Sequence, residues 1–280
     1  MENEPVYTAG IDIGSAFSKG VILSDGDMAA FHILPSEGDY GSSSERLMKG
    51  LLNKAGISIK DIMHVTSTGY GAAKVSFSNQ TANDVTCHGK GIYNLSPSVR
   101  TAVDIGAQFT RVFKVDATGG ISTFLLSDKC AAGSGRFLQV IARVLQVDLE
   151  DIGELSLRSK KVVDFNTGCA VFTETETISR VAEGATVEDI LAGIHRMLSA
   201  KIDSMLMRLG LEQDLALVGG GARDIGLVRS VKDRMHVDIF VPDEPQIVAA
   251  LGAALIAYDV VKAPPINRDR GRPRGPQDYF

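Results

Sequence analysis

A pattern of three short strands occurs twice in this chain, and in each copy the first strand ends in Asp-Ile-Gly. The first copy is predicted over Tyr7 to Ile13, Ser18 to Leu23 and Met28 to Leu34. The second copy is predicted over Thr101 to Ile105, Thr110 to Val115 and Gly120 to Leu126. We interpret the pattern as an internal duplication, which predicts two similar α/β halves.

The segments outside these strands show helical or strand periodicity. Helices are predicted over Ser44 to Ala55, Val187 to Leu209, Arg223 to Arg234 and Pro245 to Tyr258, and strands over Asp61 to Val65, Leu215 to Val218 and Val237 to Val241. An insertion at 127–184 is predicted to hold helices over Arg136 to Leu145, Asp148 to Arg158 and Ala170 to Ala182. We expect an N-terminal lobe at 1–100, a C-terminal lobe with the insertion at 101–262, and a disordered tail at 263–280.

Composition and charge narrow the class of protein. The chain has 280 residues, of which 44% are hydrophobic and 22% charged, as in ordinary soluble globular proteins. Its net charge of -5 argues against general nucleic-acid binding. Because we find neither a membrane-length apolar run nor a signal-like start, we expect a cytoplasmic protein without a membrane partner. Three cysteines in such a chain do not make a disulfide framework.

The first turn has the residue types that bind phosphate. Asp12 lies at a strand end, Gly14 and Ser15 form the turn, and Lys19 lies on the returning strand. Backbone amides and Lys19 can hold the β- and γ-phosphates of a nucleotide, while Asp12 can hold Mg²⁺ through water. The plain alternative is a hairpin whose glycine serves only the turn. The second copy of the turn favours the phosphate site.

The second turn is predicted to face the same cleft. Asp104 is the second candidate for the water shell of Mg²⁺, Gly106 shapes the turn, and Gln108 could orient an attacking water. A third segment follows an apolar strand and precedes a helix, where bare backbone could lie against adenine or ribose. It consists of Gly219, Gly220, Gly221 and Ala222. This third segment alone is weak evidence, because glycine is common in such turns.

Taken in chain order, these three segments resemble the phosphate-1, phosphate-2 and adenosine motifs of the actin, Hsp70 and sugar-kinase superfamily. The resemblance spans roughly Tyr7 to Tyr258. It implies a duplicated, ribonuclease-H-like fold of two lobes, with ATP and Mg²⁺ in the cleft. The Walker sequence is absent, and the glycine pattern does not fit a dinucleotide-binding Rossmann turn.

Two cysteines in the insertion, Cys130 and Cys169, each precede a predicted helix. A [4Fe-4S] cluster normally takes four cysteine ligands, so a chain that offers two needs a second chain to supply the others. The alternative for either cysteine is simple burial, the commonest state of a free thiol. For Cys87 we prefer burial, and for His88 a structural role.

The segments around both cysteines are similar to those of ATPases that activate 2-hydroxyacyl-CoA dehydratases and of ATP-binding subunits of benzoyl-CoA reductase. The matching segments are Lys129 to Leu138 and Cys169 to Glu176. This resemblance implies that Cys130 and Cys169 bind half of a [4Fe-4S] cluster shared across a twofold or pseudo-twofold interface. It also implies that ATP binding and hydrolysis reshape the helices beside the cluster.

The same insertion contains further candidate site residues. Glu174 or Glu176 could polarise a hydrolytic water, although only one of them can face the cleft because residues two apart point to different sides of a helix. Gly133 and Gly135 belong to the turn after the first cysteine and are candidate cofactor-binding residues. Arg136 is a candidate phosphate contact, and its plain alternative is a surface cation near a helix start.

Within this group, two departures favour the small, D-type ATP-binding component of benzoyl-CoA reductase. Activators have Gly-Gly-Gln-Asp and Val-Ala-Gln-Asn where this chain has Gly106 to Phe109 and Gly221 to Asp224. In this interpretation, the chain couples ATP hydrolysis to electron transfer from ferredoxin to aryl-CoA-binding subunits. A paralogous ATPase subunit, or a second copy, completes the cluster. The alternatives are a homodimeric dehydratase activator and, in a different class, a redox-inactive kinase or structural ATPase.

Overall fold

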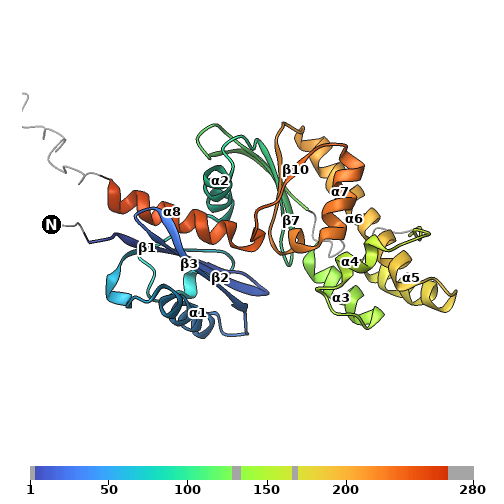
Figure 1. Ribbon diagram of the computed structural model, residues 1–280, viewed down its shortest axis with the longest axis horizontal. Coiled ribbons are helices and arrows are strands. Elements are labelled where there is room, and N and C mark those ends of the chain that lie inside the picture. Colours follow the sequence, from blue (N-terminus) through green and yellow to red (C-terminus); the bar gives the residue numbers. More distant parts are fainter. Residues whose placement is uncertain (1–3, 128–133, 166–169, 264–280) are drawn as a thin grey trace, which may run out of the picture.

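Two five-stranded mixed sheets form the frame of the protein in a computed structural model that describes residues 4–127, 134–165 and 170–263 (Figure 1). The first sheet has the order β3-β2-β1-β4-β5 and contains β1 (Tyr7–Ile13), β2 (Phe17–Ser24), β3 (Asp27–Pro35), β4 (Ile62–Thr68) and β5 (Gln80–Thr81). The second has the same order, β8-β7-β6-β9-β10, and contains β6 (Thr101–Ile105), β7 (Thr110–Val115), β8 (Ile121–Leu126), β9 (Leu215–Val218) and β10 (Ile239–Phe240).

Strand pairing is repeated between the two sheets. β1 pairs antiparallel with β2 and parallel with β4, as β6 pairs antiparallel with β7 and parallel with β9. In this register Asp12 lies opposite Lys19, and Asp104 lies opposite Arg111. The predicted duplicated α/β fold is therefore confirmed.

The described residues also form eight α-helices. They are α1 (Tyr40–Ala55), α2 (Asp84–Leu95), α3 (Gly135–Leu145), α4 (Ile152–Leu157), α5 (Ala170–Ala182), α6 (Val187–Leu209), α7 (Ile225–Met235) and α8 (Val248–Lys262). Figure 1 shows α1 and α8 on opposite faces of the first sheet. Alternate residues of β1 and β2 explain this arrangement, because Ile11 and Ile22 pack with α1 while Val21 and Leu23 pack with α8.

Helix α8 returns from the end of the second half to cover the first sheet, and it packs along α2. The approach is so close that a Cβ atom at Gly252 would overlap the backbone carbonyl of Cys87. The segment Pro245–Lys262 is long and apolar enough to cross a membrane, but 67% of it is buried, as in the core helix of a soluble fold. Since α2 and α8 each pack across the expected lobe boundary, the limits 1–100 and 101–262 stay a prediction.

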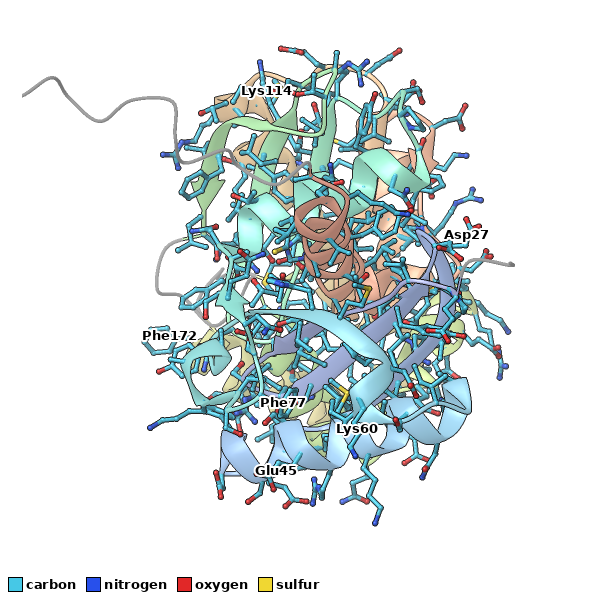
Figure 2. All side chains as sticks on the ribbon, turned by 90° about the vertical axis from the view of Figure 1, so that its left-hand side faces the viewer. Asp27, Glu45, Lys60, Phe77, Lys114 and Phe172 are labelled. Atoms are coloured by element: carbon cyan, nitrogen blue, oxygen red, sulfur yellow. The ribbon has the colours of Figure 1, made fainter. Side chains whose placement is uncertain are left out.

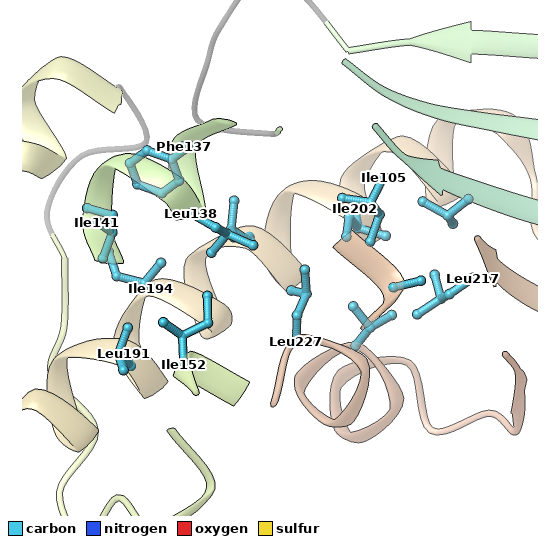
Figure 3. Close-up of a cluster of buried hydrophobic side chains, with 14 of the residues drawn as sticks. Ile105, Phe137, Leu138, Ile141, Ile152, Leu191, Ile194, Ile202, Leu217 and Leu227 are labelled. Carbon is cyan, nitrogen blue, oxygen red and sulfur yellow. The ribbon is translucent and has the colours of Figure 1, made fainter. Parts of the chain in front are cut away.

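The insertion shares a hydrophobic core with the second sheet (Figure 3). Phe137, Leu138 and Ile141 of α3 are buried in the same cluster as Ile194 of α6 and Ile105 of β6. The insertion is therefore packed onto the sheet that carries the second Asp-Ile-Gly turn. Charged side chains such as Glu45, Lys60 and Lys114 lie on the outer surface (Figure 2), where Phe172 of α5 is also exposed.

Several element boundaries differ from the sequence prediction. Helix α2 was not predicted, because two glycines and few apolar residues weaken its helical pattern; Asn83 caps it, and its packing on α8 stabilises it. Helix α1 begins earlier, after the N-cap residue Asp39, which accepts a hydrogen bond from the amide of Gly41 at 2.9 Å. Helix α4 and strand β10 are shorter than expected. The predicted tail lies almost wholly outside the described residues.

The close contact between α2 and α8 generates a prediction for stability. Gly252→Ala should lower the free energy of unfolding by about 1–3 kcal/mol, because the new methyl group forces the two helices apart. Chemical denaturation monitored by circular dichroism measures this change. Gly38→Ala is the matched control, since a Cβ atom there has nothing within 4 Å. A more stable Gly252→Ala variant would show that helix propensity outweighs the contact.

Candidate functional site

A cavity of about 720 Å³ lies where the turns of both halves meet. It is lined by most of the residues that the sequence singled out: Asp12, Gly14, Ser15, Lys19, Asp104, Gly106, Gln108, Gly135, Gly219, Gly220 and Gly221. Residues from both ends of the chain therefore share one site. The volume and the mixture of charge and bare backbone suit a small phosphorylated ligand.

The first turn holds a buried ion pair. Lys19 Nζ lies 2.5 Å from Asp12 Oδ2 and also donates to the carbonyl of Phe17 at 3.3 Å. The turn is closed by a 3.1 Å hydrogen bond from the amide of Gly14 to the same carbonyl. Strand pairing thus places one carboxylate and one ammonium side by side on the cavity wall.

The second turn repeats this design with a different cation. The amide of Gly106 donates to the carbonyl of Phe109 at 3.0 Å, as Gly14 does in the first turn. Arg111 donates to Asp104 Oδ2 through Nε at 3.0 Å and through Nη2 at 2.6 Å. Gln108 is exposed on the turn and lines the cavity.

Basic side chains lie next to Asp104. Burial alone would raise the pKa of this carboxyl group, but His88 and Arg111 lower it. The His88 Nε2 atom lies 3.6 Å from Asp104 Oδ1, and its Nδ1 atom lies 2.8 Å from the carbonyl oxygen of Asp84. Asp104 is therefore kept ionised inside the cleft. His88 thus lines the cleft, whereas the sequence suggested only a structural role.

Arg111 was not among the residues predicted for the site, although the spacing of charged residues in the sequence indicates it. In both copies a basic residue follows the turn aspartate by seven positions, from Asp12 to Lys19 and from Asp104 to Arg111. The cross-strand register makes these two pairs equivalent.

A second missed feature is the glycine turn after β4. Gly69 and Gly219 follow the equivalent strands β4 and β9 and have φ angles of +85° and +83°. A Cβ atom at either position would overlap the carboxylate of Asp12 or of Asp104. The sequence Gly-x-Gly-Ala occurs both at 69–72 and at 219–222, and this repeat indicates the turn after β4. Both turns need glycine because a side chain would displace the aspartate that they face.

The end of the cavity near Gly219 has polar groups beside bare backbone. Arg223 Nη1 donates to Gln246 Oε1 at 3.2 Å, and both side chains line the cavity. Asp224 caps α7 through its Oδ1 atom, and its Oδ2 atom lies 2.8 Å from Nε2 of the buried His195. Ala222 is buried beneath this surface rather than lining it. This end suits a nucleoside, whereas the two charged turns suit its phosphates.

The insertion is hydrogen-bonded directly to the second turn. The amide of Gly135 donates to the carbonyl of Gly106 at 2.8 Å, and the amide of Arg136 donates to the carbonyl of Ala107 at 3.0 Å. The start of α3 is thereby attached to the backbone that lines the phosphate end of the cavity. The Arg136 side chain is not among the cavity-lining residues that the structure describes.

The segment that leads to the second cysteine is attached elsewhere. Asp189 Oδ1 accepts hydrogen bonds from the amide of Lys161 at 2.8 Å and from Ser159 Oγ at 2.7 Å. These bonds, that of Lys161 first, lower the pKa of Asp189 to about 2. The carbonyl of Val163 lies so close to Gly193 of α6 that a Cβ atom there would overlap it. This segment is therefore fixed on α6.

The predicted cluster ligands Cys130 and Cys169, and Gly133, lie outside the described residues. Glu174 and Glu176 lie on α5, and neither is among the described residues that line the cavity. Glu176 Oε1 is paired with Arg180 Nη2 at 2.9 Å. A role for either glutamate in hydrolysis stays a prediction.

The carboxylates of the cleft fit a hydrated Mg²⁺ ion better than a protein-enclosed one. Within residues 4–127, 134–165 and 170–263, no three His, Cys, Asp or Glu side chains converge as a metal site. Mg²⁺ commonly keeps several waters and is held by one or two carboxylates together with substrate phosphates. Asp12 and Asp104 supply that kind of donor set.

Known proteins share this fold and align with most of this chain. The 2-hydroxyisocaproyl-CoA dehydratase activator of Clostridioides difficile is 40% identical over 257 residues, covering 92% of this chain and 97% of that protein. A structure of the activator of this dehydratase from Clostridium difficile, with bound ADPNP, has a TM-score of 0.88 and 41% identity, covering 92% of this chain and 96% of that one.

Two further relatives belong to other enzyme systems. The crystal structure of the Acidaminococcus fermentans (R)-2-hydroxyglutaryl-CoA dehydratase component A has a TM-score of 0.89 and 35% identity, covering 92% of this chain and all of that one. The D-type component of benzoyl-CoA reductase from Thauera aromatica is 32% identical over 260 residues, covering 89% of this chain and 92% of that protein. The sequence model of the BadF/BadG/BcrA/BcrD ATPase family matches residues 9–257. This chain is a member of the BadF/BadG/BcrA/BcrD ATPase family.

Proposed function

We propose that this protein is the ATP-hydrolysing activator of a 2-hydroxyacyl-CoA dehydratase. In this role it binds ATP in the cleft and, with a second copy of itself, holds a [4Fe-4S] cluster that passes electrons from ferredoxin to the dehydratase. The observation that carries the proposal is the attachment of the cysteine-bearing insertion to the phosphate end of the cleft through Gly106 and Ala107. In a kinase or structural ATPase of the same fold, the two cysteines of the insertion would have no role.

Different residues of the cleft bind different parts of the nucleotide. Lys19 and the amides of the first turn hold the terminal phosphates, and the glycine turn at 219–221 receives the nucleoside. Asp12 and Asp104 would hold a hydrated Mg²⁺ ion, and that ion would neutralise charge on the transferred phosphoryl group. Gln108 orients the attacking water, so that ATP and water give ADP and inorganic phosphate. The similar structure with bound ADPNP supports this use of the cleft.

Cys130 and Cys169 are proposed to bind half of the cluster. In the sequence they precede α3 and α5, and these two helices pack against each other. Helix N-termini stabilise the negative charge of a thiolate-bound cluster. When bound, the cluster would supply one-electron chemistry, with ferredoxin as the donor of the electron and the dehydratase as its acceptor.

Communication between nucleotide and cluster follows from the two hydrogen bonds at the start of α3. If the second turn shifts when the γ-phosphate binds or leaves, the carbonyls of Gly106 and Ala107 move the amides of Gly135 and Arg136 with them. The segment before Cys169 is fixed on α6 instead, by Asp189 and Gly193. Such a shift would change the angle between α3 and α5, and with it the hydrogen bonds and solvent exposure that set the potential of a bound cluster.

A component of benzoyl-CoA reductase is the second candidate. It is favoured by Phe109, which is exposed beside the cleft where activators are expected to have Asp, and by Arg223 and Asp224 in the late motif. The comparisons favour the activator, because identity to the dehydratase activator and to the dehydratase component A is 40% and 35%, against 32% to the reductase component. The expectation of aryl-CoA-binding partner subunits therefore becomes the alternative. Cytoplasmic location stays a prediction.

Purification without oxygen tests the assignment directly. An activator should elute as a dimer of a single 29.8 kDa chain with about four iron and four sulfide per dimer. Three additional co-purifying subunits would instead identify the reductase. Colourless, iron-free material from the native source would contradict both assignments and favour a kinase or structural ATPase.

Loss of a cluster ligand should separate the cluster from the nucleotide site. Cys130→Ser and Cys169→Ser should each abolish bound iron while the Kd for ADP stays within about threefold, because in the proposed function these thiols bind the cluster and the turns of the cleft bind the nucleotide. Iron analysis and calorimetric titration with ADP measure the two outcomes. Cys87→Ala is the matched control, since Cys87 is buried against α8 and this variant should keep its iron. Full iron content in both serine variants would refute the ligand assignment.

Loss of the first-turn cation should have the opposite effect. Lys19→Gln should weaken ADP binding by about 10- to 100-fold, because a charged hydrogen bond to phosphate contributes about 1.5–3 kcal/mol. The iron content of the dimer should not change. An exposed lysine, Lys60→Gln, serves as the control. Unchanged nucleotide affinity in Lys19→Gln would place the phosphates elsewhere.

A further inference from the structure

We propose that Arg111 is a positioning residue for ATP hydrolysis, which fixes the carboxylate of Asp104 without itself binding the phosphates. This inference rests on the proposed ATPase function of the cleft. It gives the two equivalent cations of the duplicated halves different tasks. Lys19 binds the nucleotide, and Arg111 orients the second turn.

Arg111 has the same position in the second sheet as Lys19 has in the first. It lies directly opposite Asp104 on the neighbouring strand, just as Lys19 lies opposite Asp12. Each half therefore places one cation beside the aspartate at the end of its first strand. The duplicated fold, and not chance, brings Arg111 to the cleft.

Lys19 and Arg111 differ in the number of groups that each side chain contacts. Lys19 is a single ammonium that contacts one carboxylate oxygen and one carbonyl. All three guanidinium nitrogens of Arg111 face carboxylates: Nε and Nη2 bind Asp104 Oδ2, and Nη1 binds Asp84 Oδ2. A planar guanidinium fixes such partners in direction as well as in distance. Because all three nitrogens are bonded in this way, Arg111 fixes the side chains of Asp104 and Asp84.

One carboxylate oxygen of Asp104 is not bound by Arg111. Arg111 engages its Oδ2 atom, so Oδ1 is the oxygen that faces His88 Nε2 at 3.6 Å and the bare backbone of Gly219. Gly219 and His88 both line the cavity. Arg111 therefore selects which oxygen Asp104 presents to a water or metal in the cleft. Without Arg111 the plane of the carboxylate is no longer fixed in that direction.

The experiment compares turnover with affinity in Arg111 variants of the intact dimer. Arg111→Gln should lower kcat for ATP hydrolysis by about 10- to 100-fold, as expected for a misplaced catalytic group. The Kd for ADP should stay within about threefold, in contrast to Lys19→Gln. Arg111→Lys should recover at least half of the loss on a logarithmic scale, because Lys19 shows that a lysine at this register reaches its aspartate. Arg229→Gln, a surface change on α7, should match the wild type.

Three results would overturn the proposal. They are a wild-type kcat in Arg111→Gln, an Arg111→Lys variant no more active than Arg111→Gln, and a loss of ADP affinity above tenfold in either variant. If Arg111→Gln does not fold, Arg111→Gln combined with Asp84→Asn removes one of the two unpaired carboxylates and serves the same test. Failure of wild-type protein to hydrolyse ATP or bind ADP would instead refute the proposed function.

Discussion

Two backbone hydrogen bonds connect the parts of this protein that have different chemistry. They run from the amides of Gly135 and Arg136 to the carbonyls of Gly106 and Ala107, and so join the start of α3 to the second phosphate turn. Backbone groups make them, so the sequence at these positions can vary without losing the connection. The buried core of α3 then carries any movement of the turn into the insertion, because close-packed interiors transmit displacement.

Both phosphate turns are bonded to the segment that follows the third strand of their half. In the first half the amide of Ser36 donates to the carbonyl of Ala16 at 2.8 Å, whereas in the second half the bonds lead to the insertion. Both halves build the same turn from an aspartate, a cross-strand cation and a facing glycine. Only the second half has the insertion, which holds α3 to α5 between β8 and α6. The first turn can therefore serve as a fixed phosphate-binding surface, while the second both binds the nucleotide and reports its state.

Much of the fold and of the site could be predicted from the sequence. The strands β1, β6, β7 and β9 and the helices α3, α5 and α6 were located within a residue or two, because alternation and helical periodicity are strong there. Helix α2 could not be predicted, since its stability comes from packing against α8, which is distant in the chain. For the same reason His88 and Asp84, which α2 brings to the cleft, had no visible role in the sequence.

Coupling between nucleotide and insertion is the central claim, and hydrogen exchange of residues 134–145 measures it most directly. We expect the amides at the start of α3 to be protected in the nucleotide-free dimer and their exchange rates to differ between the ADP-bound and ADPNP-bound forms. Residues 159–163, which are fixed on α6, should exchange equally in both forms. Identical exchange at the start of α3 in the nucleotide-free, ADP-bound and ADPNP-bound dimers would contradict the claim.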